Sequence, residues 1–200
     1  MQMLTNSMVG LNRLAVVASV EVVSRVEVGD LGRPTPCAEW TLAELLAHMT
    51  VQHHGFAEAA RGNGGDLGVW RARPLGDDPV GEYTAAAERV LAAFAEAGVP
   101  EREFELPEFQ PVSRFAAARA IGFHLIDYVV HGWDVARSIG VGYELDPELA
   151  EPALRIARAV PNGANRLEPG AAFAPALADG AGTPLDRILA ALGRSPGWPD

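Results

Sequence analysis

The chain has 200 residues, of which 48% are apolar and 21% are charged. These proportions are typical of one globular domain with a buried core, and not of a disordered or repetitive chain. The net charge is −10 and all 16 basic residues are Arg, so the basic excess of a nucleic-acid-binding protein is missing. The single cysteine, Cys37, has no partner for an internal disulfide, and no apolar run reaches the ~18 residues of a membrane span. We therefore expect a cytoplasmic protein with neither nucleic-acid nor membrane partners.

Four long segments carry apolar residues at the three- and four-residue spacing of an amphipathic helix. They cover, in chain order, residues 4–26, 41–61, 78–97 and 113–139. The second opens with a capping box formed by Thr41 and Glu44, in which each side chain accepts a hydrogen bond from a free backbone N–H at the helix start. The fourth is the longest and stops at Gly140, as glycine after a helix often indicates.

The connection over residues 62–77 is rich in glycine, but it lacks the spacing and the preceding strand of a dinucleotide-binding loop. A loop of this length is either a flexible link or a lid over a functional site. In the second case Arg71 and Arg73 would face an anionic ligand. Two shorter helices follow from Asp146 and Thr183, and we expect Pro152 to kink or interrupt the first of them.

The alternation of strands and helices that builds a parallel sheet is absent from the sequence. The pattern predicts an all-α fold, an up-and-down four-helix bundle over residues 1–145. Residues 146–200 are predicted to form a helical appendage that packs on this bundle within a single structural unit.

Histidine and aspartate residues share one side of the fourth predicted helix. At about 100° per residue, His124, Asp127 and His131 project from a strip about 60° wide, and Asp134 continues it. The strip borders the apolar face of this helix, where buried Asp and His are costly unless they pair or hold a metal. The i, i+4 spacing of Asp127 and His131 lets both side chains reach one ion.

The second predicted helix offers a counterpart to this strip. His48 lies in its apolar stripe together with Gln52, whereas His54 falls on the opposite, solvated side and His53 lies between them. If the bundle brings the two helices together, His48 would face Asp127 and His131. Two His and one carboxylate on facing helices form an open metal site.

Plainer interpretations of the same residues stay open at this point. His48 could be a core histidine satisfied by one hydrogen bond, and Asp127 could pair with His124 or His131 along one helix. Asp134 could accept the free ring N–H of His131, which would fix the tautomer of a metal ligand, or it could pair with Arg137 on the surface. Cys37 is expected to be structural and not reactive.

Four motifs, in this order along the chain, carry a family resemblance. They are Thr35-Pro36-Cys37-Ala38-Glu39-Trp40-Thr41, Leu45-Leu46-Ala47-His48-Met49, His131-Gly132-Trp133-Asp134-Val135-Ala136-Arg137 and Leu192-Gly193-Arg194-Ser195-Pro196. With these motifs the chain resembles the actinobacterial DinB-like metal-binding proteins related to the N-terminal domain of mycothiol-dependent maleylpyruvate isomerase.

The resemblance implies a DinB-like four-helix bundle with a divalent metal, most often zinc, with nickel, iron or manganese as alternatives. Its ligands would be His48, Asp127 and His131, where the isomerase relatives carry Glu and many DinB proteins carry His at the position of Asp127. His124 is the alternative ligand. Asp134 and Gln52 are expected to support the ligands.

The resemblance also implies a function. In the thiol-dependent relatives the metal binds the sulfur of mycothiol, and the resulting thiolate attacks an electrophilic carbon of a second substrate. We therefore expect a transferase or isomerase whose partners are a small-molecule thiol and an electrophile, with Arg71 or Arg73 binding an anionic group. A homodimer is compatible with this interpretation. The alternatives are a hydrolase that uses a metal-bound water and a non-catalytic metal-binding or stress-related protein.

Overall fold

The computed structural model describes residues 7–37, 40–109, 113–168, 171–178 and 182–199. Its long helices are α2 (Met8–Val23), α3 (Leu42–Ala60), α4 (Pro79–Phe94), α5 (Ala117–Ile139), α6 (Pro147–Ala159) and α7 (Pro184–Ala191). The short 3₁₀ helices are η1 (Val28–Asp30), η2 (Leu67–Trp70), η3 (Val99–Glu101) and η4 (Ala164–Leu167), and the strands are β1 (Glu103–Glu105) and β2 (Arg114–Ala116). Within the described residues, no helix is both long and apolar enough to cross a membrane.

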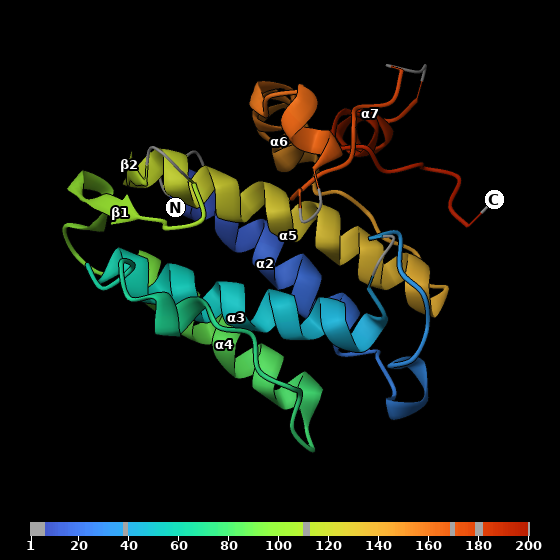
Figure 1. The fold of residues 1–200 in the computed structure, drawn as a ribbon, viewed down its shortest axis with the longest axis horizontal. Helices are drawn as coiled ribbons and strands as arrows, with labels where there is room; N and C mark the ends of the chain where they lie inside the picture. The colour runs from blue at the N-terminus through green and yellow to red at the C-terminus, as the bar shows by residue number, and fades with distance from the viewer. Residues whose placement is uncertain (1–6, 38–39, 110–112, 169–170, 179–181, 200) are drawn as a thin grey trace.

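Helices α2 to α5 form a four-helix bundle, which confirms the predicted all-α fold class (Figure 1). Helix α5 packs against α2 and α3, and α4 packs against the same two helices from the other side. The predicted first helix is shorter than expected, because α2 ends at Val23; its predicted start at residue 4 lies outside the described residues.

The helix directions do not alternate, so the predicted up-and-down order is wrong. Helices α3 and α4 run parallel, since Glu58 pairs with Arg89 and, farther along both helices, Arg61 pairs with Glu96. Helices α2 and α5 are also parallel (Figure 1). The cause is the connection over residues 62–77, which runs back along the bundle so that α4 begins at the end where α3 begins.

A small hairpin was missed by the sequence patterns. Strands β1 and β2 pair antiparallel, with Phe104 opposite Phe115 and both rings buried against the bundle. Residues 114–116, expected in the fourth helix, form β2, and α5 begins at Ala117. Strands of three residues are too short for an alternating pattern to identify them.

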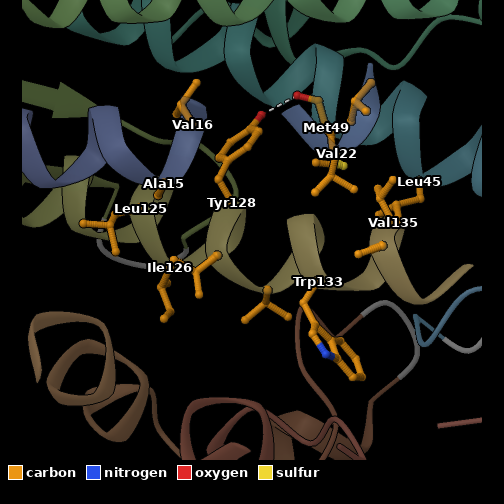
Figure 2. Close-up of a cluster of buried hydrophobic side chains, with 14 of the residues drawn as sticks. Ala15, Val16, Val22, Leu45, Met49, Leu125, Ile126, Tyr128, Trp133 and Val135 are labelled. Atoms are coloured by element: carbon orange, nitrogen blue, oxygen red, sulfur yellow. Dashed lines mark hydrogen bonds between the residues drawn. The ribbon is translucent and has the colours of Figure 1, made fainter. Parts of the chain in front are cut away.

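Helix α5 is buried on opposite sides. In Figure 2, Tyr128 points from α5 toward Met49 on α3, while Trp133 leaves the helix on the other side, toward the C-terminal segments. Helices α6 and α7 pack on each other, and α6 also packs on α2 and α5. Helix α5, which carries the strip of His and Asp side chains, therefore lies between the other bundle helices and the C-terminal segments.

Helix α6 is continuous through Pro152, so the predicted interruption is wrong. Pro152 is the sixth residue of the helix and removes only the N–H that would bond to the exposed first turn. The loss of one hydrogen bond at this place is offset by burial of Leu149, Ala153 and Ala157 on the inner face.

Candidate metal centre

The three predicted ligands converge on one point between α3 and α5. One donor atom each from His48, Asp127 and His131 lies within 4.8 Å of the others. The Nε2 atom of His131 is 3.3 Å from one carboxylate oxygen of Asp127, and Nε2 of His48 is 3.9 Å from the other. The two imidazole rings meet edge to face at a centroid distance of 5.4 Å.

Local structure explains how the chain presents His48. The hydroxyl of Thr41 accepts a hydrogen bond from the backbone N–H of Glu44, and the Glu44 carboxylate accepts one from Thr41, as the capping box predicts. Just before this cap, the Thr35 hydroxyl donates to the carbonyl of Trp40 and closes a turn. The Trp40 ring then packs 4.6 Å from the His48 ring and forms an aromatic wall of the site.

The charges in the cluster are strongly coupled. Burial lowers the pKa of His48 to about 4. At neutral pH its ring is therefore uncharged, and one ring nitrogen has a lone pair that can bind a metal ion. Burial alone would raise the pKa of Asp127, but His131 and then His48 outweigh this effect and lower it. Burial alone would lower the pKa of His131, but Asp127 and Asp134 raise it above its ordinary value. At neutral pH the cluster therefore carries a carboxylate between the neutral ring of His48 and the protonated ring of His131. A cation bound at Nε2 of His131 would displace the proton from that nitrogen.

A buried carboxylate lies behind His131. Asp134 is fully buried and accepts a hydrogen bond of 2.9 Å from Nδ1 of His131. This bond fixes the ring so that Nε2 faces Asp127. Asp134 does not pair with Arg137, which instead donates to the backbone carbonyl of Trp198. Asp134 is thus paired with His131 and not with Arg137.

The second partner of Asp134 was missed by the sequence analysis. Arg194, directly after α7, donates to both carboxylate oxygens at 3.1 to 3.3 Å and is itself buried. Sixty residues separate the two positions, and helical periodicity cannot pair residues across such a distance. The one available signal was that Arg194 belongs to the last of the four resemblance motifs.

His124, the alternative ligand, lies in a different cluster. Its Nδ1 is 2.8 Å from Oδ1 of Asn12, and its Nε2 is 3.2 Å from Nδ1 of His53. Both ring nitrogens are thus already paired inside the bundle. His53 is fully buried, contrary to its expected intermediate position, and His54 is half-buried where it was expected to be solvated. Both differences arise because α3 packs on α4 as well as on α5.

A carboxyl group near the cluster, that of Glu108, was missed by the sequence analysis, because no periodic pattern or motif includes it. The side chains of His48 and Asp127 are 27% and 24% exposed, whereas His131 is 4% exposed. Gln52, one turn after His48, hydrogen-bonds the side chain of Glu108 from the β1–β2 loop. Partial burial, followed by the charge of Asp127, raises the pKa of Glu108 above its ordinary value, although the residue stays exposed to solvent. Gln52 thus connects this loop to the predicted site.

The loop over residues 62–77 does not bring its arginines to the cluster. Arg71 and Arg73 are exposed, and among the described residues the charges acting on the three clustered side chains do not include either of them. Arg73 acts instead on His54. Cys37 lies nearer the site, where burial raises its pKa to about 11, so its sulfur is a protonated thiol at neutral pH.

The donor set fits a divalent cation. Two imidazole nitrogens and one carboxylate oxygen are the ligands of many catalytic zinc sites, which keep a further position open. The histidine bonded to a carboxylate through its other nitrogen is the usual support of such a site. Because His48 and Asp127 are partly exposed, a small molecule could reach an ion held by these atoms.

Comparison with known proteins shows which family the chain belongs to. Residues 13–136 match the family described as mycothiol maleylpyruvate isomerase N-terminal domain. An uncharacterized protein of Mycobacterium tuberculosis, found in strains CDC 1551 and H37Rv, is 32% identical over 186 residues, which cover 89% of this chain and 92% of the relative.

Solved structures show the same fold. The crystal structure of the mycothiol-dependent maleylpyruvate isomerase superposes with a TM-score of 0.57 at 15% identity, covering 76% of this chain and 67% of that one. A histidine-to-alanine mutant of that isomerase gives a TM-score of 0.59. These matches confirm the resemblance seen in the four sequence motifs. The chain belongs to the mycothiol maleylpyruvate isomerase N-terminal domain family.

Proposed function

We propose that this protein is a divalent-metal-dependent enzyme that uses a low-molecular-weight thiol, as a transferase or isomerase. His48, Asp127 and His131 would hold the ion, with zinc as the first choice and nickel, iron or manganese as alternatives. The observation that carries the proposal is the convergence of three donor atoms within 4.8 Å at a partly exposed position.

Each residue has a defined task in this proposal. A bound cation would lower the pKa of a thiol at its open position and so supply a thiolate near neutral pH. Asp134 holds the His131 ring with Nε2 toward the ion. Trp40 shields one side of His48. Glu108, hydrogen-bonded by Gln52 and close enough to feel the charge of Asp127, would accept the thiol proton and return it to the product.

Mycothiol is the proposed thiol. The support is the family itself and the solved isomerase and its mutant, whose names state mycothiol dependence. The second substrate would be an electrophile, because a thiolate attacks an electron-poor carbon. A thiol cosubstrate also requires a reducing compartment, which agrees with the expected cytoplasmic location.

X-ray absorption at the zinc edge tests this proposal on the intact, untagged, zinc-loaded protein. We expect nitrogen and oxygen ligands in the resting protein and a new zinc–sulfur distance of about 2.3 Å when mycothiol is added. Asp127→Asn serves as the variant that weakens the site. If mycothiol adds no sulfur to the zinc, the thiol-dependent function is contradicted. If esters or amides are hydrolysed without any thiol, the hydrolase replaces it.

A further inference from the structure

A buried ion pair ties the C-terminal segment to the proposed metal centre. Arg194 directs Nε and Nη2 at the carboxylate of Asp134, at distances of 3.1 to 3.3 Å. The same carboxylate accepts the Nδ1–H of His131 at 2.9 Å. One oxygen, Oδ2, receives hydrogen bonds from both residues. Asp134 thus links Arg194, in the segment after α7, to the proposed ligand His131 through hydrogen bonds.

A second contact holds the same segment. Arg137, on α5 three residues after Asp134, donates through Nε and Nη2 to the backbone carbonyl of Trp198. Arg194 and Trp198 therefore bracket a short stretch that α5 holds at both ends. A stretch fixed in this way can hold the Arg194 guanidinium in one orientation.

The energetics of the pair suggest that stability alone does not explain it. Asp134 is 0% exposed and Arg194 is 5% exposed. Removing both charges from water costs several kcal/mol for each ion, and the pair regains about this much only in good geometry. Such a pair gives little net stability, but its planar, two-pronged contact fixes the plane of the carboxylate. That plane in turn fixes the ring of His131.

We propose that Arg194 is a positioning residue of the metal centre, so that the C-terminal segment over residues 184–199 completes the site that α3 and α5 provide. This inference rests on the proposed metal at His48, Asp127 and His131. Without Arg194, the Asp134 carboxylate would lose the two-pronged contact that fixes its plane and would turn away from the His131 ring. The His131 ring would then lose the acceptor that orients it.

The test compares Arg194→Met with Arg166→Met in the full chain. Arg166 is a matched control, because it is equally buried at 5% exposure and also holds the C-terminal part of the chain. Among the described residues, its acceptors are the backbone carbonyls of Pro161, Ala174, Ala191 and Val160. Both substitutions should lower the free energy of unfolding, but of the two arginines it is Arg194 that contacts Asp134.

Zinc affinity, measured by competition with a chromophoric chelator, is the deciding quantity. We expect Arg194→Met to weaken zinc binding by about 10- to 100-fold, the range typical of residues that support a metal ligand, and Arg166→Met to leave it unchanged. If Arg194→Met does not fold, Arg194→Lys keeps the charge without the planar fork and should still bind zinc more weakly than the wild type. Equal affinity in wild type and Arg194 variants, or an equal loss in Arg166→Met, would overturn the inference.

A metal-free readout separates this inference from the proposed function. In the apo protein, the His131 Nδ1–H proton should be visible by NMR as a slowly exchanging signal in the wild type and Arg166→Met, and absent in the Arg194 variant. If the wild type binds no zinc, the proposed function fails, whatever this signal shows. If the signal persists in the Arg194 variant, the positioning role fails even where zinc binds.

Discussion

Single residues of the site differ in how far the sequence could place them. Asp127 and His131 follow from 100° steps along one helix, and His48 from the apolar stripe of another. The same reasoning failed for His53, because α3 is buried on more than one face. Helical angles show which residues share a face, but they do not show how much of the helix surface is buried. Arg194 could not be paired with Asp134, since nothing local connects two positions that lie sixty residues apart.

The contacting buried histidines His53 and His124 make the stability of the fold depend on pH. Burial lowers the pKa of His124 to about 3 and that of His53 well below its ordinary value. Between about pH 6.5 and pH 3 the unfolded chain therefore binds protons that the folded chain does not. Stability should fall with decreasing pH across this window by up to about 1.4 kcal/mol per pH unit for each histidine.

Urea unfolding of His124→Gln across this pH range checks the effect. The variant should be less stable at pH 7, because Asn12 and His53 lose their partner, but its free energy of unfolding should fall less steeply toward acid. Glu88→Gln, at an exposed position of α4, should keep the wild-type slope. An unchanged slope in His124→Gln would show that the pair is not neutral in the folded protein.

At the scale of elements, capping residues and periodicity predicted the helices, and short or connecting elements were missed. The capping box at Thr41 is present as predicted, because its hydrogen bonds are local. The β1–β2 hairpin was not predicted, because its two three-residue strands are stabilised by burial of Phe104 and Phe115 against the bundle. Contacts of this kind do not appear in a local pattern.

Removal of the cap should weaken α3 at the end that carries His48. Thr41→Ala should lower the free energy of unfolding by about 1 kcal/mol, because the N–H of Glu44 loses its acceptor. Thr84→Ala, within α4 and away from any cap, should change it by less than half as much. Guanidinium unfolding followed by circular dichroism measures both; equal losses would mean that the box does not stabilise the helix start.

The Trp70 ring packs on Gly55 of α3 and anchors the connection over residues 62–77. A Cβ atom at Gly55 would lie 2.3 Å from the Trp70 ring, whereas one at Gly122 would find ordinary contacts at 3.5 Å or more. Gly55→Ala should therefore displace Trp70 and cost about 1 to 3 kcal/mol. Gly122→Ala should be neutral or stabilising, because alanine favours a helix.

Limited proteolysis together with thermal unfolding distinguishes these two glycine variants. Faster cleavage within residues 62–77 is expected in Gly55→Ala only. Resistance equal to that of the wild type would show that Trp70 does not anchor the connection to α3.

For the whole molecule, the fold class could be predicted and the topology could not. Amphipathic periodicity identifies four long helices but gives no direction for helices joined by a sixteen-residue connection (residues 62–77), which can span the bundle or return along it. The structure shows that it returns, so that α3 and α4 are parallel (Figure 1). The antiparallel packing of α3 and α5 still brings His48 to His131.

Metal binding should stabilise the whole fold, because the proposed ligands join α3 to α5. Free zinc at 100 times its dissociation constant should add about 2.7 kcal/mol to the free energy of unfolding. Calorimetry with and without zinc measures this gain, and a strong chelator should reverse it. A melting temperature that does not respond to zinc would contradict a site formed by the folded bundle.

The most direct test of the proposed metal centre is the zinc stoichiometry and affinity of the untagged protein. We predict one zinc ion per chain in the wild type and in His54→Ala, and loss of this ion in His48→Ala and His131→Ala, because only the latter two remove donor atoms of the cluster. Full zinc content in both of these variants would contradict the account. Loss of zinc in His54→Ala alone would place the ion elsewhere in the molecule.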